Sequence, residues 1–280
     1  MNQLSIHDRV QILNCLSEGM GVNATARVTG KSKNTVLKLL ADVGQACALY
    51  QDRVMNNLNC ERIECDEIWS FVGAKQKNVR NDKESHAEFG DCYTFTAIDP
   101  VTKLMPCWLV GTRSSQCTED FICDLAPRLA GRIQLPTDGW NAYPKAVDLA
   151  FAGRIDYAVL NKSYDAGGAS VEAKRRYSPP AFVKAVKQMV TGNPDRYNIS
   201  TSLVERANLS MRMGMRRFIR LTNAFSKKLE NHMHAVSFYF MVYNFVKIHS
   251  SIKTTPAMEA CVTDFLWSIE DIAVMAETNA

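Results

Sequence analysis

The apolar residues of this 280-residue chain change from a helical period to a strand period at Glu61, and this change limits the folds that the chain can adopt. Before Glu61, apolar residues recur three and four positions apart. After it, three strand-like segments follow one another, at 61–72, 92–98 and 104–110, and helix and strand patterns then alternate to residue 160. This order predicts an α/β fold, in which a mixed sheet is flanked by helices.

The later elements are predicted from the same two periods. The expected helices cover 114–129, 143–151, 203–221, 229–248 and 256–275, and the expected strands cover 132–137 and 154–160. Residues 161–202 interrupt the pattern with a polar and basic insertion, in which only 180–190 favours a helix. A connection this long is unusual in a compact domain, which indicates a functional or flexible segment.

Residues 1–48 are predicted to form an N-terminal all-α helix-turn-helix domain, followed by a helical linker over 49–60. Helical segments at 8–17 and 22–28 are separated by two glycines, and Ser32 is a suitable N-cap for a third helix. In a helix-turn-helix domain this third segment would be the recognition helix. An alternative is a small helical bundle that mediates contacts between subunits. The exposed candidates for DNA contact are Lys31, Lys33, Asn34, Thr35 and Lys38.

The composition fits a soluble globular protein, with 46% hydrophobic and 22% charged residues. The net charge of +4 is small but unevenly distributed. Residues 205–228 hold seven Lys or Arg and one acid, whereas residues 61–100 hold nine acids and five bases. A basic helix beside an acidic sheet suits a site that binds both phosphate and metal. The polar N-terminus and the lack of a long apolar run predict neither a secretory signal nor a membrane span, and hence a cytoplasmic protein.

Three acidic residues are the main candidates for chemistry. Asp66 lies in the segment ECDEIW, Asp138 in PTDGW and Glu205 in VERAN. The first two are expected at strand ends and the third at the start of a basic helix. Taken singly, they are also explained as a polar strand edge, a turn residue and a favourable charge at a helix N-terminus. Taken together, they suit two Mg²⁺ or Mn²⁺ ions about 3.5–4 Å apart, which activate water or a 3′-hydroxyl for attack on a phosphodiester.

The predicted helix 203–221 places further polar side chains near the third acid. At about 100° per residue, Glu205, Asn208, Arg212 and Arg216 share one face. Asn208 and Arg212 are therefore expected to reach metal-bound water or the scissile phosphate, although a solvated helix face explains them equally well. The residues expected to contact DNA from this region are Asn208, Arg212, Arg216, Arg217, Arg220 and Lys227.

These segments resemble the transposases of the insertion sequence one family. The similarity rests on CDEIWSFVG at 65–73, TDG at 137–139 and VERAN at 204–208, and it spans about residues 60–250. It implies a DDE transposase whose ribonuclease H-like catalytic domain covers 61–250, before a helical tail over 251–280. Asp66, Asp138 and Glu205 would then be both the catalytic residues and the metal ligands. The better-known members begin with a cysteine-rich zinc-binding segment, but the nine cysteines here form no CxxC pair, so zinc is not predicted.

The resemblance also implies the partners. Such a protein binds the terminal inverted repeats of its own element as double-stranded DNA, cuts them and transfers the strands to target DNA. Holding two ends requires a homo-oligomer, at least a dimer, and the expected location is a bacterial or archaeal cytoplasm, at the nucleoid when bound. The alternatives are a ribonuclease H-like nuclease or junction resolvase, and a catalytically inactive helix-turn-helix DNA-binding protein derived from a transposase.

Overall fold

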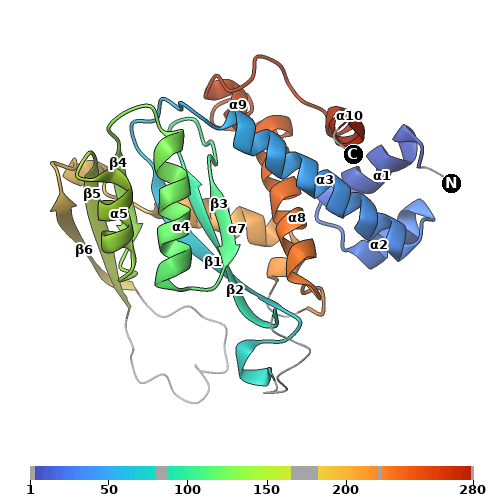
Figure 1. The fold of residues 1–280 in the computed structure, drawn as a ribbon, viewed down its shortest axis with the longest axis horizontal. Coiled ribbons are helices and arrows are strands. Elements are labelled where there is room, and N and C mark those ends of the chain that lie inside the picture. Colours follow the sequence, from blue (N-terminus) through green and yellow to red (C-terminus); the bar gives the residue numbers. More distant parts are fainter. Residues whose placement is uncertain (1–3, 80–87, 165–181, 220–221, 279–280) are drawn as a thin grey trace.

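A six-stranded mixed sheet forms the centre of the protein, in a computed structural model that describes residues 4–79, 88–164, 182–219 and 222–278 (Figure 1). The strand order is β3-β2-β1-β4-β5-β6. The first three strands are antiparallel, β4 is parallel to both β1 and β5, and β6 is antiparallel to β5. The predicted mixed sheet flanked by helices is therefore confirmed. The strands are β1 (Glu64–Val72), β2 (Gly90–Ile98), β3 (Trp108–Gly111), β4 (Gln134–Asp138), β5 (Asp156–Tyr164) and β6 (Phe182–Thr191).

Helices cover both faces of this sheet (Figure 1). Helices α4 (Ser115–Leu125) and α5 (Tyr143–Phe151) pack against each other on one face. Helix α7 (Ser202–Gly214) packs on β1 and β2 from the other face. The remaining C-terminal elements are α8 (Leu229–Met241), a π-helical turn (Val242–Val246), α9 (Pro256–Glu259) and α10 (Ile269–Thr278).

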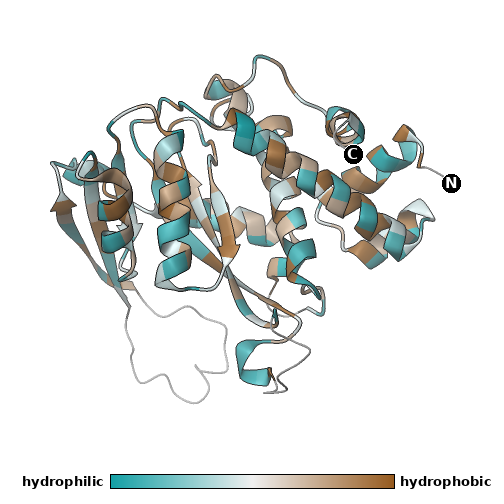
Figure 2. Ribbon diagram, in the orientation of Figure 1, coloured by the Kyte–Doolittle hydropathy of each residue, from teal (hydrophilic) through white to brown (hydrophobic). Residues whose placement is uncertain are grey.

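Three helices precede the sheet, as predicted, and the third is much longer than expected. They are α1 (Ile6–Ser17), α2 (Val22–Thr29) and α3 (Lys33–Val54), which continues through the first part of the predicted linker. The hydroxyl of Ser32 accepts the N–H of Thr35 at 3.0 Å and caps α3 as predicted. Brown and teal residues alternate along α3, as expected for a helix with one buried face (Figure 2). The second half of α8 is buried nearly all round. The division of the chain into domains stays a prediction.

Two glycines allow the N-terminal helices to lie directly on the C-terminal ones. A Cβ atom at Gly44 of α3 would lie 2.5 Å from Cβ of His234 on α8. A Cβ atom at Gly19, in the turn after α1, would lie 2.7 Å from the carbonyl oxygen of Gly214 at the end of α7, and Gly19 has a positive φ of 77°. One hydrophobic core continues from Ile12 through the sheet to Ala276. The N-terminal helices therefore form a fixed wall beside α7 and α8.

Several sequence-based expectations are corrected. The segment 182–190 is part of strand β6 and not a helix, because its backbone pairs with β5 from Tyr157 to Tyr164, a tertiary contact that overrides local pattern. The helix predicted over 203–221 ends at Gly214, and a 3₁₀ turn over Arg216–Phe218 follows it. Strand β3 begins only at Trp108, four residues after the predicted start at Leu104.

Within the described ranges, no helix combines the length and the apolar character needed to cross a bilayer.

Candidate metal centre

Three carboxylates gather where strand β4 leaves strand β1. Asp66, Glu67 and Asp138 each offer an oxygen atom, and these oxygens all lie within 4.8 Å of one another. Cys65 of β1 is paired in parallel with Thr137 of β4, which brings Asp66 and Asp138 side by side. Strand β4 ends at Asp138, whereas β1 continues to Val72 paired with β2. Asp138 is thus at a strand end as expected, but Asp66 is the third residue of a nine-residue strand and not at its end.

Burial and mutual repulsion raise the pKa values of two of these carboxyl groups. Desolvation, followed by the charge of Asp138, raises the pKa of Asp66 to about 6 and that of Glu67 to about 7. Oxygen Oε1 of Glu67 and the hydroxyl of Tyr143 are both buried, and the interaction between these two side chains opposes the rise in the pKa of Glu67. Carboxylates held this close are stabilised by protonation or by a shared cation, and their oxygen atoms are suitable ligands for a hard cation.

Arg113 neutralises part of this negative charge. Its Nη2 atom lies 3.2 Å from Oε2 of Glu67 and 3.5 Å from Oδ2 of Asp138. The guanidinium stacks on the ring of Trp140, with 4.5 Å from Cζ to the ring centroid. Trp140 is held in turn by a hydrogen bond from Nε1 to the hydroxyl of Thr118 at 3.0 Å. The arginine side chain is about one-third exposed, so it lies between the carboxylate cluster and solvent.

Helix α7 is attached to β1 by two buried polar residues. The side chain of Glu64 accepts the N–H groups of Leu203 and Val204, at 2.9 and 3.2 Å, and thereby satisfies the first turn of α7. One turn further on, Nδ2 of Asn208 donates to Oδ2 of Asp66 at 2.9 Å. Asn208 also accepts a hydrogen bond from the hydroxyl of Thr96 at 3.0 Å. The start of α7 is therefore fixed next to the carboxylate cluster.

Glu205 lies close to this cluster but does not belong to it. Its carboxylate is ion-paired with Lys162 of β5 and accepts a hydrogen bond from Thr201 at 2.7 Å. The negative charge of Glu205 contributes, as a minor cause, to the raised pKa of Asp66, which shows that the two groups are neighbours. The structure brings Asp66 and Asp138 together, whereas the Glu205 carboxylate is paired with Lys162.

The residues expected to contact DNA fall into three groups. Asn208 and Arg212 lie on α7, one turn apart and on the side of Glu205. Arg216 and Arg217 lie after the end of α7, so Arg216 does not continue that face as expected, and with Lys227 they line a separate groove. Arg220 lies outside the described residues.

The third group is on the N-terminal helices. Lys33, Asn34 and Lys38 are exposed. Lys31 pairs with Asp8 at 2.8 Å, and Thr35 is bound to the Ser32 cap. Whether any of these residues contacts DNA stays a prediction.

Sequence reasoning did not assign a role to Glu64, Glu67 or Arg113. Glu64 and Glu67 were visible as neighbours of Asp66, but alternation along a strand places Glu67 on the opposite face from Asp66. Its carboxylate still reaches the cluster because β4 ends beside it. Arg113 left no signal, since it follows a short strand at the far side of β2 and its approach depends on tertiary packing.

Comparisons with known proteins give little further information. No family model and no curated protein matches the sequence. Among solved structures, the chain is similar to the piggyBac transposase in the cryo-EM structure of its synaptic complex with hairpin DNA. The match has a TM-score of 0.46 at 10% sequence identity, and it covers 98% of this chain and 70% of that chain. A similarity this weak carries no argument about function.

Proposed function

We propose that this protein is a DDE transposase with a ribonuclease H-like core, similar to the insertion sequence one family, which cuts and joins DNA strands in a metal-dependent reaction. The observation that carries the proposal is the cluster of Asp66, Glu67 and Asp138 within 4.8 Å, beside the helix that holds Glu205. The order β3-β2-β1-β4-β5, with an antiparallel meander followed by two parallel strands, supports the ribonuclease H-like assignment.

The donor set suits a hard divalent cation. Carboxylate oxygens are the preferred protein ligands of Mg²⁺ and Mn²⁺, and Glu67 offers a second buried oxygen, Oε1, besides the Oε2 that is paired with Arg113. Asp66, Asp138 and Glu205 would hold two such ions, with Glu67 as an additional ligand for one of them. When bound, ions of this kind activate a water or 3′-hydroxyl nucleophile and stabilise the leaving oxygen.

The residues around the carboxylates would keep this site in order. Asn208 fixes the orientation of Asp66 through its amide. Arg113 balances the charge of Glu67 and Asp138, and its guanidinium is suited to bind a phosphate oxygen of the substrate when those carboxylates are neutralised. Glu64 holds the start of α7, and with it Glu205, against β1.

The proposed substrates are the terminal inverted repeats of the element that encodes the protein, and the target DNA that receives them. Lys33, Asn34 and Lys38 on the exposed part of α3 would contact the repeats as double-stranded DNA. Two ends must be held together during transfer, so we also propose a homo-oligomer, at least a dimer, that acts on chromosomal DNA in the cytoplasm of a bacterium or archaeon.

A strand-transfer assay tests this proposal. Purified protein is incubated with Mg²⁺ or Mn²⁺, a plasmid target and a labelled duplex that carries the inverted repeat found beside the coding sequence. We expect joined products, and we expect Asp66→Asn, Asp138→Asn and Glu205→Gln each to lose them while duplex binding persists. The matched control is Asp148→Asn, an acid on α5 with no role in the proposed site.

Other outcomes select the alternatives. Cleavage without joining would indicate a nuclease or junction resolvase. Repeat binding without any cation-dependent cleavage, in the unmodified protein and under all conditions, would indicate an inactive DNA-binding protein derived from a transposase.

A further inference from the structure

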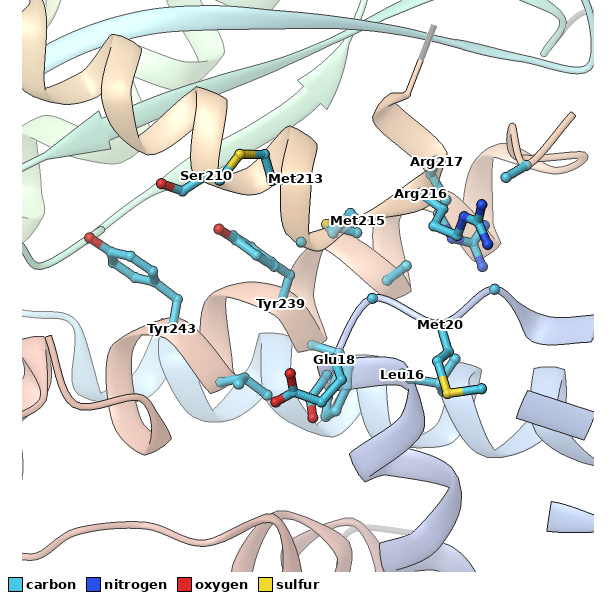
Figure 3. Close-up of a pocket in the computed structure, with 18 of the residues that line it drawn as sticks. Leu16, Glu18, Met20, Ser210, Met213, Met215, Arg216, Arg217, Tyr239 and Tyr243 are labelled. Atoms are coloured by element: carbon cyan, nitrogen blue, oxygen red, sulfur yellow. The ribbon is translucent and has the colours of Figure 1, made fainter. Parts of the chain in front are cut away.

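A deep groove lies beside helix α7, on the side away from the carboxylate cluster (Figure 3). Its volume is about 1370 Å³. The turn between α1 and α2 forms one wall, the end of α7 and the segment 213–217 form the opposite wall, and α8 forms the floor. The backbone contact between Gly19 and Gly214 joins the two walls, so the N-terminal helices are a built part of the groove.

Helix α7 separates this groove from the proposed catalytic site. At about 100° per residue, Glu205, Asn208 and Arg212 lie on one side of the helix. Arg206, Ser210 and Met213 lie on the other side and line the groove. The groove is therefore a second site, and a ligand bound in it is separated from the carboxylates by α7.

The charge of the groove is strongly positive. Among the described residues, nine Lys or Arg line it, against one carboxylate, that of Glu18. Arg216 is exposed and projects into it beside Arg217 (Figure 3). Lys227 stacks over the ring of Phe225, at 3.5 Å from the centroid. A wall of cations with a single nearby acid attracts a polyanion.

Arg217 is a half-buried cation that lines this groove. Burial lowers the pKa of its guanidinium to about 10, and no described carboxylate lies within ion-pair distance of it. It donates instead to the hydroxyl of Ser226 at 2.9 Å, and that hydroxyl lies 2.8 Å from Nδ1 of the buried His232. The pKa of His232 is lowered to about 3 by burial and by Arg217, so the histidine is neutral. A half-buried guanidinium that is held only by neutral groups, among the described residues, is stabilised by a bound anion such as a phosphate.

Apolar and aromatic side chains occupy the remainder of the groove. Met20 lies on the wall formed by the N-terminal turn, Met213 is 71% exposed on the α7 side, and the rings of Tyr239 and Tyr243 project from α8 and the π-helical turn after it (Figure 3). The two rings are stacked, with centroids 6.3 Å apart. A DNA duplex presents phosphates but hides its base faces, whereas a single strand presents both. Cations interleaved with aromatic and apolar surface are the recognised composition of single-strand sites.

We propose that this groove binds a single strand of nucleic acid, with Arg216, Arg217 and Lys227 on its phosphates and Met213 and the tyrosines against its bases. The inference rests on the proposed function only in taking DNA as the substrate. The strand would be an unpaired flank of the DNA end, held on one side of α7 while its junction with the duplex is presented to the carboxylates on the other.

Binding is measured without a divalent cation, so that it does not depend on catalysis. The full-length protein is titrated into a fluorescent single-stranded oligonucleotide of mixed sequence in EDTA, and binding is followed by anisotropy. We expect the double variant Arg216→Ala/Lys227→Ala to bind at least about tenfold more weakly, and its slope of log K against log salt to fall by about 0.7 for each phosphate contact removed. Lys184→Ala/Arg196→Ala, which removes two exposed cations on β6 and in the turn after it, is the charge-matched control and is expected to bind within about twofold of the unmodified protein.

Two further variants separate this role from general electrostatics and from folding. Met213→Glu, at an exposed position, is expected to weaken single-strand binding more than duplex binding. Arg217→Met removes the unpartnered charge, and we expect it to keep or raise the melting temperature while losing the stabilisation that the oligonucleotide confers.

The proposal is overturned if these groove variants bind the single strand normally, or if single-strand and duplex affinity fall in parallel. A second contradicting outcome concerns Arg217 itself. If Arg217→Met unfolds the protein, and Arg217→Lys is less stable but binds the oligonucleotide normally, then Arg217 is a structural residue and the proposal is overturned. If the unmodified protein binds the oligonucleotide as expected but shows no strand transfer, the proposed function is contradicted and the proposal for the groove stands.

Discussion

Asn208 donates a hydrogen bond from Nδ2 to Oδ2 of Asp66 at 2.9 Å, and this contact joins helix α7 to the strand that carries the carboxylate cluster. The amide oxygen of Asn208 is also used, as the acceptor for Thr96. Because both ends of the amide are engaged and the residue is buried, its orientation is fixed. Asn208 is therefore a positioning residue for Asp66, and α7 cannot shift along β1 without breaking this bond.

The first prediction concerns this bond. Asn208→Ala removes the donor to Asp66 and leaves the buried hydroxyl of Thr96 with one partner fewer, so we expect a loss of roughly 1–3 kcal/mol of unfolding free energy. We also expect cation affinity to fall by about 10–100-fold, as for other residues that orient metal ligands. Chemical unfolding and calorimetric titration with Mn²⁺ measure the two effects. Ser210→Ala, on the opposite side of α7, is the control, and an equal loss of cation affinity there would refute the positioning role.

The second prediction concerns the attachment of α7 at its first turn. Glu64 is fully buried and accepts two backbone N–H groups at the start of this helix. We expect Glu64→Ala to cost about 1–3 kcal/mol, because it leaves those donors buried and unsatisfied. Glu64→Gln keeps one acceptor oxygen and should cost less. Urea unfolding of the three proteins orders them, and equal stability of the alanine variant and the unmodified protein would exclude the capping role.

The third prediction is a dependence of cation binding on pH. The pKa of Asp66 is raised from 3.8 to about 6 and that of Glu67 from 4.5 to about 7. Between about pH 4 and pH 7 the unfolded chain has lost protons that the folded protein retains, so these two groups contribute less stability as the pH rises through that window. A cation must displace the same protons, and its affinity should therefore increase from about pH 6 to about pH 8.

Thermal shifts caused by Mn²⁺ at several pH values measure this effect. We expect a larger shift at about pH 8 than at about pH 6 for the unmodified protein. Glu67→Gln removes the group with the higher pKa, so it should flatten the upper part of the profile. A shift independent of pH across this range would exclude protonated carboxyl groups from the cation site.

Features that depend on residues close together in the sequence could be predicted, whereas those that depend on contacts between distant segments could not. The period of apolar residues is a local property, and it identified β1, β2, α4, β4 and α5 close to their observed bounds. The end of α7 at Gly214 was missed because apolar spacing continues through Met215 and Phe218, although a glycine there allows the contact with Gly19. Strand β6 was missed because its pairing with β5 is made by the backbone, which the side-chain pattern does not encode.

The site was predictable to a similar degree. Asp66 and Asp138 could be associated from the sequence because both lie in segments that resemble the same family. The parallel pairing of Cys65 with Thr137 brings them together in the structure. The arginine at the mouth of the site could not be found in this way. Arg113 meets Glu67 and Asp138 only after β3 and α4 have packed, and no spacing in the sequence reports that event.

The fourth prediction concerns the packing of α3 on α8. A Cβ atom at Gly44 would lie 2.5 Å from Cβ of His234 and 2.6 Å from its carbonyl oxygen, so the two helices must separate to admit it. We expect Gly44→Ala to cost about 1–3 kcal/mol, despite the higher helix propensity of alanine. Gly30→Ala, in open space but at a positive φ, tests backbone strain without a clash. If Gly44→Ala were as stable as the unmodified protein, the contact between α3 and α8 would be looser than described.

The last prediction concerns the ion pair between Lys162 and Glu205, which keeps the third acid away from the cluster. The lysine side chain is 21% exposed and the glutamate side chain 44%, so the pair contributes little stability, roughly 0–1 kcal/mol. Lys162→Met should therefore change the melting temperature only slightly, yet it frees the Glu205 carboxylate to act as a ligand. We expect the variant to bind Mn²⁺ more tightly, or with an additional equivalent, in calorimetric titration. The double variant Lys162→Met/Glu205→Gln should lose this gain, because the freed ligand is then absent. If Lys162→Met binds Mn²⁺ like the unmodified protein, Glu205 is not a metal ligand, and the cluster of Asp66, Glu67 and Asp138 constitutes the whole site.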